Sequence, residues 1–343
     1  MNAVVWNSER KLIFDKEYPD PQCRKDWVII KVVSAGVCAT DLAVIRGEFG
    51  PPPLIPGHEI AGVVAEVGSM VHSVKPGDRV VVETAVSCGH CRACESGNKH
   101  LCPECREIGF PPYNGGYAEY VAAPENCIKF LPDNVSFDEG GILEAALCPF
   151  GLIYRYGITP GATVLIQGNG VAGLSFLQTV KCFSASKVIM SVRRESAVET
   201  AKSFGADVVV NTSVDSLEEC VMAETNGLGV DVSIDATGNP AAIQKAVQLA
   251  CSGGRVVLYG LPGMNAKLPD FPARDIILRQ LTVLGGTNNQ LAWDPLLSLV
   301  SSGRFNILGM ITDAFSLEEA EKALQLTKNR PDGFIKAVLH PNR

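Results

Sequence analysis

The feature that most constrains the fold is a glycine-rich turn between a predicted strand and a predicted helix. The apolar run Thr163–Ile166 leads into Gln167-Gly168-Asn169-Gly170-Val171-Ala172-Gly173, and a helical pattern begins at Leu174. In this setting Gly168 permits a tight turn, Gly170 lets the backbone approach a pyrophosphate, and Gly173 allows the helix to pack closely on the sheet. The pattern therefore predicts a dinucleotide bound at the N-terminus of a helix.

The surrounding sequence alternates short apolar runs with longer helical stretches from Gly161 onward. This rhythm is typical of a doubly wound parallel sheet covered by helices on both faces. The six predicted strands are Thr163–Ile166, Lys187–Met190, Val208–Val210, Val230–Ile234, Arg255–Tyr259 and Leu281–Leu284.

The first 150 residues have a different character, because short β-branched strands are separated by Gly and Pro. The predicted strands are Trp27–Val33, Ile60–Val67, Asp78–Val82 and Tyr117–Val121. Two helices, Trp293–Ser301 and Leu317–Thr327, and a strand at Ile335–Leu339 are expected to return to this β-rich, barrel-like domain. We therefore predict one domain from 1–152 and 291–343 and a second from 153–290, with a continuous helix across position 152.

Composition narrows the function classes. The chain has 343 residues, 46% of them apolar, and 37 acidic against 30 basic side chains give a net charge of -7. Because phosphate backbones bind to basic surfaces, we expect no nucleic-acid partner. The start of the chain lacks a leader-like pattern and no run reaches 18 uncharged apolar residues, so we expect a cytoplasmic protein without a membrane partner.

Four cysteines lie within one short loop, Cys88, Cys91, Cys94 and Cys102. Spacings of two, two and seven residues, with Gly, Ser and Asn between them, allow four thiolates to surround one zinc ion. The alternative is a set of buried thiols or a disulfide pair. Because four thiolates complete the tetrahedron, the zinc at this site would be structural.

The end of the second predicted strand bears on cofactor choice. An NAD-binding domain normally places an acidic residue about twenty residues after the glycine motif, but here the strand ends Met190-Ser191-Val192-Arg193-Arg194. Two guanidinium groups suit the 2′-phosphate of NADP, so we favour NADP over NAD; the alternative is that the arginines face solvent. The residues assigned to the cofactor are Gly168, Gly170, Val171, Gly173, Ser191, Arg193 and Arg194.

Two further zinc-ligand types stand at predicted strand ends, Cys38 in Cys-Ala-Thr-Asp and His58 in Gly-His-Glu. With Lys75-Pro-Gly-Asp-Arg79, the four-cysteine loop, Gly115-Gly-Tyr-Ala-Glu-Tyr120 and the glycine motif, the whole chain resembles the zinc-dependent medium-chain dehydrogenase/reductase family of alcohol, sorbitol and threonine dehydrogenases. The resemblance implies an α/β protein, with a GroES-like β-rich catalytic domain and a doubly wound Rossmann domain.

The resemblance also implies a catalytic zinc site. Cys38 and His58 would be ligands, and Glu59 would either bind the metal or lie next to it. The third ligand would come from the segment before the interdomain helix, where we favour Cys148; Glu144, one helical turn earlier, is the alternative. Three protein ligands leave zinc one position for an alcohol substrate.

Two more roles follow from the resemblance. Thr40 would hydrogen-bond the substrate oxygen and pass its proton toward the nicotinamide ribose, and Asp41 would orient the ligand His58. Many family members have a histidine three residues after this threonine, whereas this chain has Ala43. The proton relay would then end in water or another group.

The sequence thus predicts a zinc-dependent alcohol or polyol dehydrogenase with two zinc ions per chain, acting on a small alcohol or carbonyl compound. The resemblance also implies a homodimer or homotetramer, for which we expect edge pairing near Leu281–Leu284. One alternative is an NAD-linked polyol, sugar-phosphate or threonine-type dehydrogenase. The other is a catalytically silent protein that keeps the fold and binds the cofactor.

Overall fold

A computed structural model of the chain describes residues 1–263, 266–268, 271–287 and 290–342. The chain divides into two compact units, Met1–Leu147 with Asn289–Arg343, and Cys148–Asn288. We call these the barrel unit and the Rossmann unit. Helix α4, Leu143–Tyr156, is continuous across the first boundary. The predicted boundaries at 152 and 291 fall a few residues from the observed ones.

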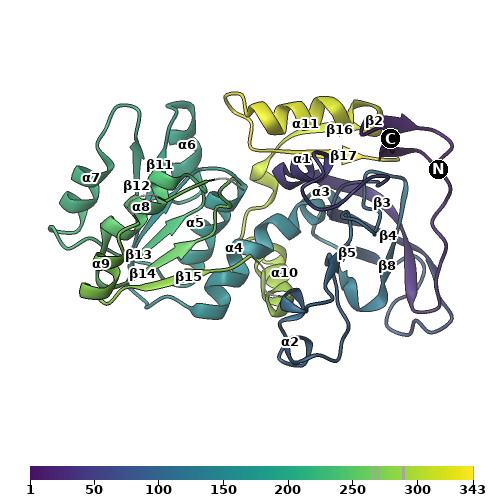
Figure 1. Ribbon diagram of the computed structural model, residues 1–343, viewed down its shortest axis with the longest axis horizontal. Helices are drawn as coiled ribbons and strands as arrows, with labels where there is room; N and C mark the ends of the chain where they lie inside the picture. The colour runs from purple at the N-terminus through teal and green to yellow at the C-terminus, as the bar shows by residue number, and fades with distance from the viewer. Residues whose placement is uncertain (264–265, 269–270, 288–289, 343) are drawn as a thin grey trace. The chain divides into compact units, whose positions relative to one another are not determined.

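The Rossmann unit contains six parallel strands in the order β12-β11-β10-β13-β14-β15, with helices running alongside them (Figure 1). This order confirms the predicted doubly wound sheet. The strands are β10 Thr163–Gln167, β11 Lys187–Val192, β12 Val208–Asn211, β13 Val230–Asp235, β14 Ala250–Leu258 and β15 Thr282–Gly285. The helices are α5 Val171–Cys182, α6 Ser196–Ser203, α7 Leu217–Glu224, α8 Pro240–Leu249 and α9 Ala273–Leu278.

Apolar β-branched residues explain why these central strands are buried on both faces. Val164, Ile166 and Ile189 are fully buried, as expected when helices cover both sides of a parallel sheet. The predicted close packing at Gly173 is also present, because a Cβ there would lie 1.9 Å from the Gly168 carbonyl oxygen. Helix α5 can therefore start directly at the end of β10.

The barrel unit is built on a seven-stranded sheet in the order β16-β17-β3-β4-β5-β9, with β8 also paired to β3. Its strands are β1 Ala3–Trp6, β2 Leu12–Asp15, β3 Trp27–Val37, β4 Glu59–Val67, β5 Arg79–Val82, β6 Ala85–Val86, β7 Arg106–Glu107, β8 Tyr120–Pro124, β9 Ile128–Phe130, β16 Ile311–Ser316 and β17 Lys336–His340. Its helices are α1 Ala39–Ile45, α2 Arg92–Glu95, α3 Phe137–Gly141, α10 Trp293–Ser301 and α11 Ala320–Asn329. Strand β17 pairs with β3, so the end of the chain returns to this unit as expected.

Three elements of the barrel unit differ from the sequence prediction. The strand predicted at Tyr117–Val121 begins only at Tyr120, because Tyr117 instead accepts a hydrogen bond from the Val4 amide at 2.8 Å. The helix predicted from Leu317 begins as a 3₁₀ turn before α11. Strand β16 was not predicted, since its half-exposed side chains include Thr312 and Asp313 and lack a continuous apolar run.

Strand pairing brings three distant parts of the sequence to one place. Gly36 in β3 pairs with Glu59 in β4, and Val37 pairs with Ala337 in β17. The end of β3 therefore lies beside the starts of β4 and β17, and the chain turns into α1 directly after β3. Within the described residues, no helix is both long and apolar enough to cross a membrane.

Candidate functional site

The strand ends of the barrel unit place three metal-ligand types together. Cys38 caps the N-terminus of α1, and His58 and Glu59 stand at the start of β4. One ligand atom from each of these residues lies within 4.8 Å of the other two. His58 and Glu59 are buried and Cys38 is half-buried. We call this group the barrel cluster.

Asp41 holds two members of the barrel cluster in position. Its carboxylate accepts hydrogen bonds from the Cys38 amide at 2.8 Å and from the Tyr117 hydroxyl at 2.7 Å, and it lies 2.9 Å from Nδ1 of His58. The contact to Nδ1 fixes the ring and leaves Nε2 as the atom that can bind a metal. Gly57 makes room for this arrangement, because a Cβ there would lie 2.3 Å from the Tyr117 ring.

Asp41 and His58 stabilise each other's charged forms. Burial opposes ionisation of Asp41, but the neighbouring His58 ring and the hydrogen bonds it accepts lower the pKa of its carboxyl group. Burial likewise disfavours a charged His58, but Asp41 and Cys38 raise the pKa of the ring well above its ordinary value. The groups around His58 therefore favour a positive charge at its ring. A divalent cation bound to the ring can supply this charge in place of the proton.

Glu59 is held by a cation from the far end of the chain. Its Oε1 lies 2.6 Å from Nζ of Lys336 in β17, and both side chains are buried. Its Oε2 is buried and has no hydrogen-bond partner within the described part of the chain. A Cβ at Gly36 would lie 2.0 Å from this oxygen, so only glycine leaves it room. An unpartnered carboxylate oxygen beside a thiol and an imidazole fits a zinc ion.

The two candidates for the third ligand both lie on α4. Glu144 and Cys148 are four residues apart, which is one helical turn, and both are half-buried. Glu144 belongs to the same unit as the barrel cluster, whereas Cys148 is the first residue of the Rossmann unit. Thr40 is half-buried beside the cluster, with its hydroxyl 3.5 Å from the Cys38 sulfur, and Ala43 follows on α1.

The four-cysteine loop forms a second ligand group, which we call the lobe cluster. The sulfur atoms of Cys88, Cys91, Cys94 and Cys102 all lie within 4.8 Å of one another. Cys91 and Cys94 are 3.6 Å apart, and Cys88 and Cys102 are 3.6 Å apart. A tetrahedral zinc with Zn–S bonds of about 2.3 Å places its sulfur atoms about 3.8 Å apart, so the spacing fits one ion.

The lobe is fixed to the rest of the barrel unit by polar contacts. Lys99 lies 2.8 Å from the buried carboxylate of Glu83, and His100 lies 3.0 Å from the Gln290 side chain. These contacts engage the lobe histidine His100 and give the loop a fixed position. The lobe cluster offers four thiols, enough for a complete tetrahedral site, whereas the barrel cluster offers three side chains.

The predicted cofactor residues gather at the carboxyl edge of the parallel sheet. Gly170 caps the N-terminus of α5, and the Gly168 amide donates a hydrogen bond of 3.2 Å to the Ser191 carbonyl. The glycine turn therefore lies next to the end of β11, where Arg193 and Arg194 follow and are exposed. The next acidic residue, Glu195, accepts a hydrogen bond from Asn211 at 3.0 Å.

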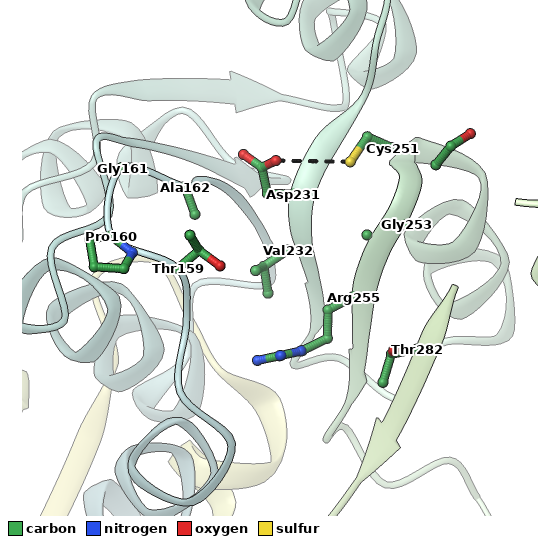
Figure 2. Close-up of a pocket in the computed structure, with 12 residues that line it drawn as sticks. Thr159, Pro160, Gly161, Ala162, Asp231, Val232, Cys251, Gly253, Arg255 and Thr282 are labelled. Atoms are coloured by element: carbon green, nitrogen blue, oxygen red, sulfur yellow. Dashed lines mark hydrogen bonds between the residues drawn. The ribbon is translucent and has the colours of Figure 1, made fainter. Parts of the chain in front are cut away.

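A hollow of about 350 Å³ opens at the opposite, amino-terminal edge of the same sheet (Figure 2). Its two charged side chains already have partners: Asp231 accepts from the Thr163 amide, and Arg255 donates to the carbonyls of Tyr156 and Gly157. Dinucleotides bind at the carboxyl ends of parallel strands, so this hollow is on the wrong edge for the cofactor.

Comparison with known proteins agrees with this geometry. The model of the alcohol dehydrogenase GroES-like domain matches residues 24–133, and that of the zinc-binding dehydrogenase domain matches residues 172–302. The chain belongs to the zinc-dependent medium-chain dehydrogenase/reductase family. A sorbitol dehydrogenase of Bacillus subtilis (strain 168) is 32% identical to it, over 100% of this chain and 98% of that one.

Two solved structures are similar to this medium-chain dehydrogenase over 99% of both chains. A putative zinc-binding dehydrogenase from Sinorhizobium meliloti 1021, bound to NADP, is 32% identical with a TM-score of 0.92. An alcohol dehydrogenase from Escherichia coli CFT073, complexed with NADH, is 28% identical with a TM-score of 0.91. One of these structures thus holds NADP and the other NADH, so the comparisons leave the cofactor choice open.

Sequence reasoning missed several side chains around the barrel cluster. Tyr117 was seen only as part of a motif, and Lys336 only as a residue of the last strand. Tyr117 lies 76 positions along the chain from its partner Asp41, and Lys336 lies 277 positions from its partner Glu59. A local sequence pattern cannot predict such long-range contacts. Phe110, whose ring centroid lies 5.3 Å from that of His58, was also missed.

Proposed function

We propose that the chain is a zinc-dependent dehydrogenase that interconverts a secondary alcohol or polyol with its ketone or aldehyde, with NADP as the favoured cofactor. The observation that carries the proposal is the barrel cluster, in which a thiol, an imidazole and an unpartnered carboxylate oxygen converge. The similarity to a sorbitol dehydrogenase supports the polyol class.

Cys38 and His58 would hold the catalytic zinc, with Glu59 at or beside it. Such an ion would polarise the hydroxyl oxygen of the substrate, and the dinucleotide would accept the hydride. For the third ligand we keep Cys148, with Glu144 as the alternative that shares a unit with the cluster. The zinc content of two variants separates these candidates. If Cys148 is the ligand, Cys148→Ser should lower the zinc content and Glu144→Gln should not. If Glu144 is the ligand, the two results should be reversed.

Thr40 would orient the reacting oxygen and take part in removing its proton. Its hydroxyl lies beside Cys38, and Ala43 offers no titratable group further along α1. Thr40→Val should therefore lower kcat about 1,000-fold while zinc content stays unchanged. Thr40→Ser, which keeps the hydroxyl, is the control and should retain most of the activity. Normal turnover by Thr40→Val would refute the role.

The preference for NADP rests on the residues after β11. Arg193 and Arg194 follow the strand end that contacts the glycine turn, and the nearby Glu195 is already bonded to Asn211. Replacing both arginines with alanine should lower kcat/KM for NADP about 30-fold and leave that for NAD within about threefold. A wild-type enzyme that prefers NAD would overturn this part of the proposal and favour the NAD-linked alternative.

The catalytically silent alternative makes a different prediction about metal content. A silent protein would need only the lobe zinc, whereas the proposed enzyme needs an ion in each ligand group. The presence of all the side chains of the barrel cluster favours the enzyme.

We also propose a homodimer or homotetramer with pairing through β15, and a reducing, cytoplasmic setting. Strand β15 is the last in the sheet order, and its edge can pair with a second copy. Ile277 and Leu278 of α9 are largely exposed nearby. The cysteines proposed as zinc ligands must be thiolates, and a reducing setting keeps thiols out of disulfides. Light scattering of the purified protein would show a single subunit mass if the edge pairing were wrong.

A further inference from the structure

Tyr117 is a fully buried side chain that packs against the residues just before His58. Its amide donates a hydrogen bond to the Pro56 carbonyl at 3.1 Å. A Cβ at Gly57 would lie 2.3 Å from Cδ1 of the tyrosine ring, so the ring lies directly against that glycine. Both the main chain and the ring of Tyr117 are therefore held next to a proposed zinc ligand, and the hydroxyl points to the side chain of Asp41 at 2.7 Å.

The two oxygen atoms of the Asp41 carboxylate have different partners. Oδ1 lies 2.9 Å from Nδ1 of His58, whereas Oδ2 accepts hydrogen bonds from the Cys38 amide and the Tyr117 hydroxyl. Among the described residues, Tyr117 supplies the only side-chain donor to Oδ2. Asp41 and Tyr117 are both 0% exposed, so bulk water does not reach the bond between them. The hydroxyl therefore helps to set the plane of a carboxylate that contacts two proposed zinc ligands.

We propose that Tyr117 is a positioning residue for the catalytic metal site: its hydroxyl fixes the Asp41 carboxylate, which in turn fixes Cys38 and His58. This inference rests on the proposed function, because it takes the barrel cluster as the site of a zinc ion. Hydrogen bonds to an ionised acceptor are stronger than those between neutral groups, and groups that orient ligand side chains affect metal affinity. Loss of the hydroxyl should therefore weaken zinc binding at the barrel cluster although every ligand is still present.

The ring and the hydroxyl of Tyr117 have separable roles. The ring fills the space beside Gly57, and a phenylalanine ring has the same carbon atoms to fill it. A phenylalanine has no donor for Oδ2 of Asp41, so only the contact to the carboxylate is lost. If Tyr117 served packing alone, Tyr117→Phe would leave metal binding unchanged. The positioning role predicts a change in metal binding from the loss of a single oxygen atom.

The zinc affinity of Tyr117→Phe tests this inference. Competition with a chelator should show about tenfold weaker zinc binding at the barrel cluster, while the lobe ion is retained. Cobalt in place of the barrel ion gives a second readout, because its visible absorption depends on ligand geometry and should differ from that of the wild type. Tyr120→Phe is the matched control, since it removes a half-buried tyrosine hydroxyl three residues away. It should leave both the zinc affinity and the cobalt spectrum unchanged.

A double-mutant cycle tests whether the hydroxyl acts through Asp41. Asp41→Asn already removes the charge that the hydroxyl binds, so adding Tyr117→Phe should weaken zinc binding by less than about twofold further. Wild-type zinc affinity in Tyr117→Phe, or an equal loss whether or not Asp41 is replaced, would overturn the role of Tyr117 alone. A wild-type chain that binds zinc only at the lobe cluster would instead refute the proposed function, and the inference with it.

Discussion

The lobe cluster and the barrel cluster are both groups of candidate metal ligands, but they are built in different ways. The lobe draws four identical thiols from one short loop, so its spacing is visible in the sequence. The barrel cluster draws mixed ligands from the ends of β3 and β4, and each of two ligands is held by a further side chain, His58 by Asp41 and Glu59 by Lys336. A metal site with four protein ligands can be built from one short loop. A site that keeps one coordination position for a substrate needs a rigid sheet to position its ligands and shield them from solvent.

This comparison predicts that changes in the barrel cluster affect turnover far more than stability. His58→Ala should lower kcat/KM about 1,000-fold or more, because a ligand of the proposed catalytic ion is lost. The melting temperature should fall moderately, because the buried Asp41 carboxylate loses its partner. His72→Ala, at an exposed histidine of the same unit, is the control for activity. Retention of activity by His58→Ala would place the chemistry elsewhere.

The lobe should behave in the opposite way. Cys102 is a buried member of the lobe cluster, and Cys102→Ser should remove the structural ion and lower the free energy of unfolding by about 4 kcal/mol. Cys105→Ser is the matched control, since Cys105 lies three residues further on and outside the cluster. Chemical denaturation measures the effect. Equal stability of the two variants would show that the lobe does not depend on its zinc.

A smaller effect should follow from weakening the support of the barrel cluster. Asp41→Asn keeps the shape of the side chain but removes the charge that orients His58. Zinc affinity at the barrel cluster should fall about 10- to 100-fold, and the lobe ion should be retained. Competition with a chelator, followed by metal analysis, measures the two sites separately. Loss of both ions at the same chelator concentration would contradict the distinction between them.

Much of the fold could be predicted from local patterns. The glycine turn after Thr163–Ile166 and the six apolar runs predicted the parallel sheet, because the periodicity of helices and strands is a local property of the sequence. The cysteine spacing predicted the lobe cluster for the same reason.

Long-range contacts account for most of what could not be predicted. Strand β16 lacks an apolar run, and Tyr117 leaves the predicted strand to bind Asp41. The partners of the barrel cluster come from β17 and from the turn after β7, and their roles depend on which strands pair. The sequence therefore predicted the ligand types Cys38 and His58, but not the side chains Lys336 and Phe110 that lie beside the barrel cluster.

The zinc content of the folded protein tests the central claim most directly. Metal analysis of the wild-type chain should find two zinc ions, one for each ligand group, and His58→Ala should hold one while remaining folded. Cys102→Ser should hold at most the barrel ion. A wild-type chain with a single zinc, or a His58→Ala variant that still binds two, would contradict the account of one closed and one open site.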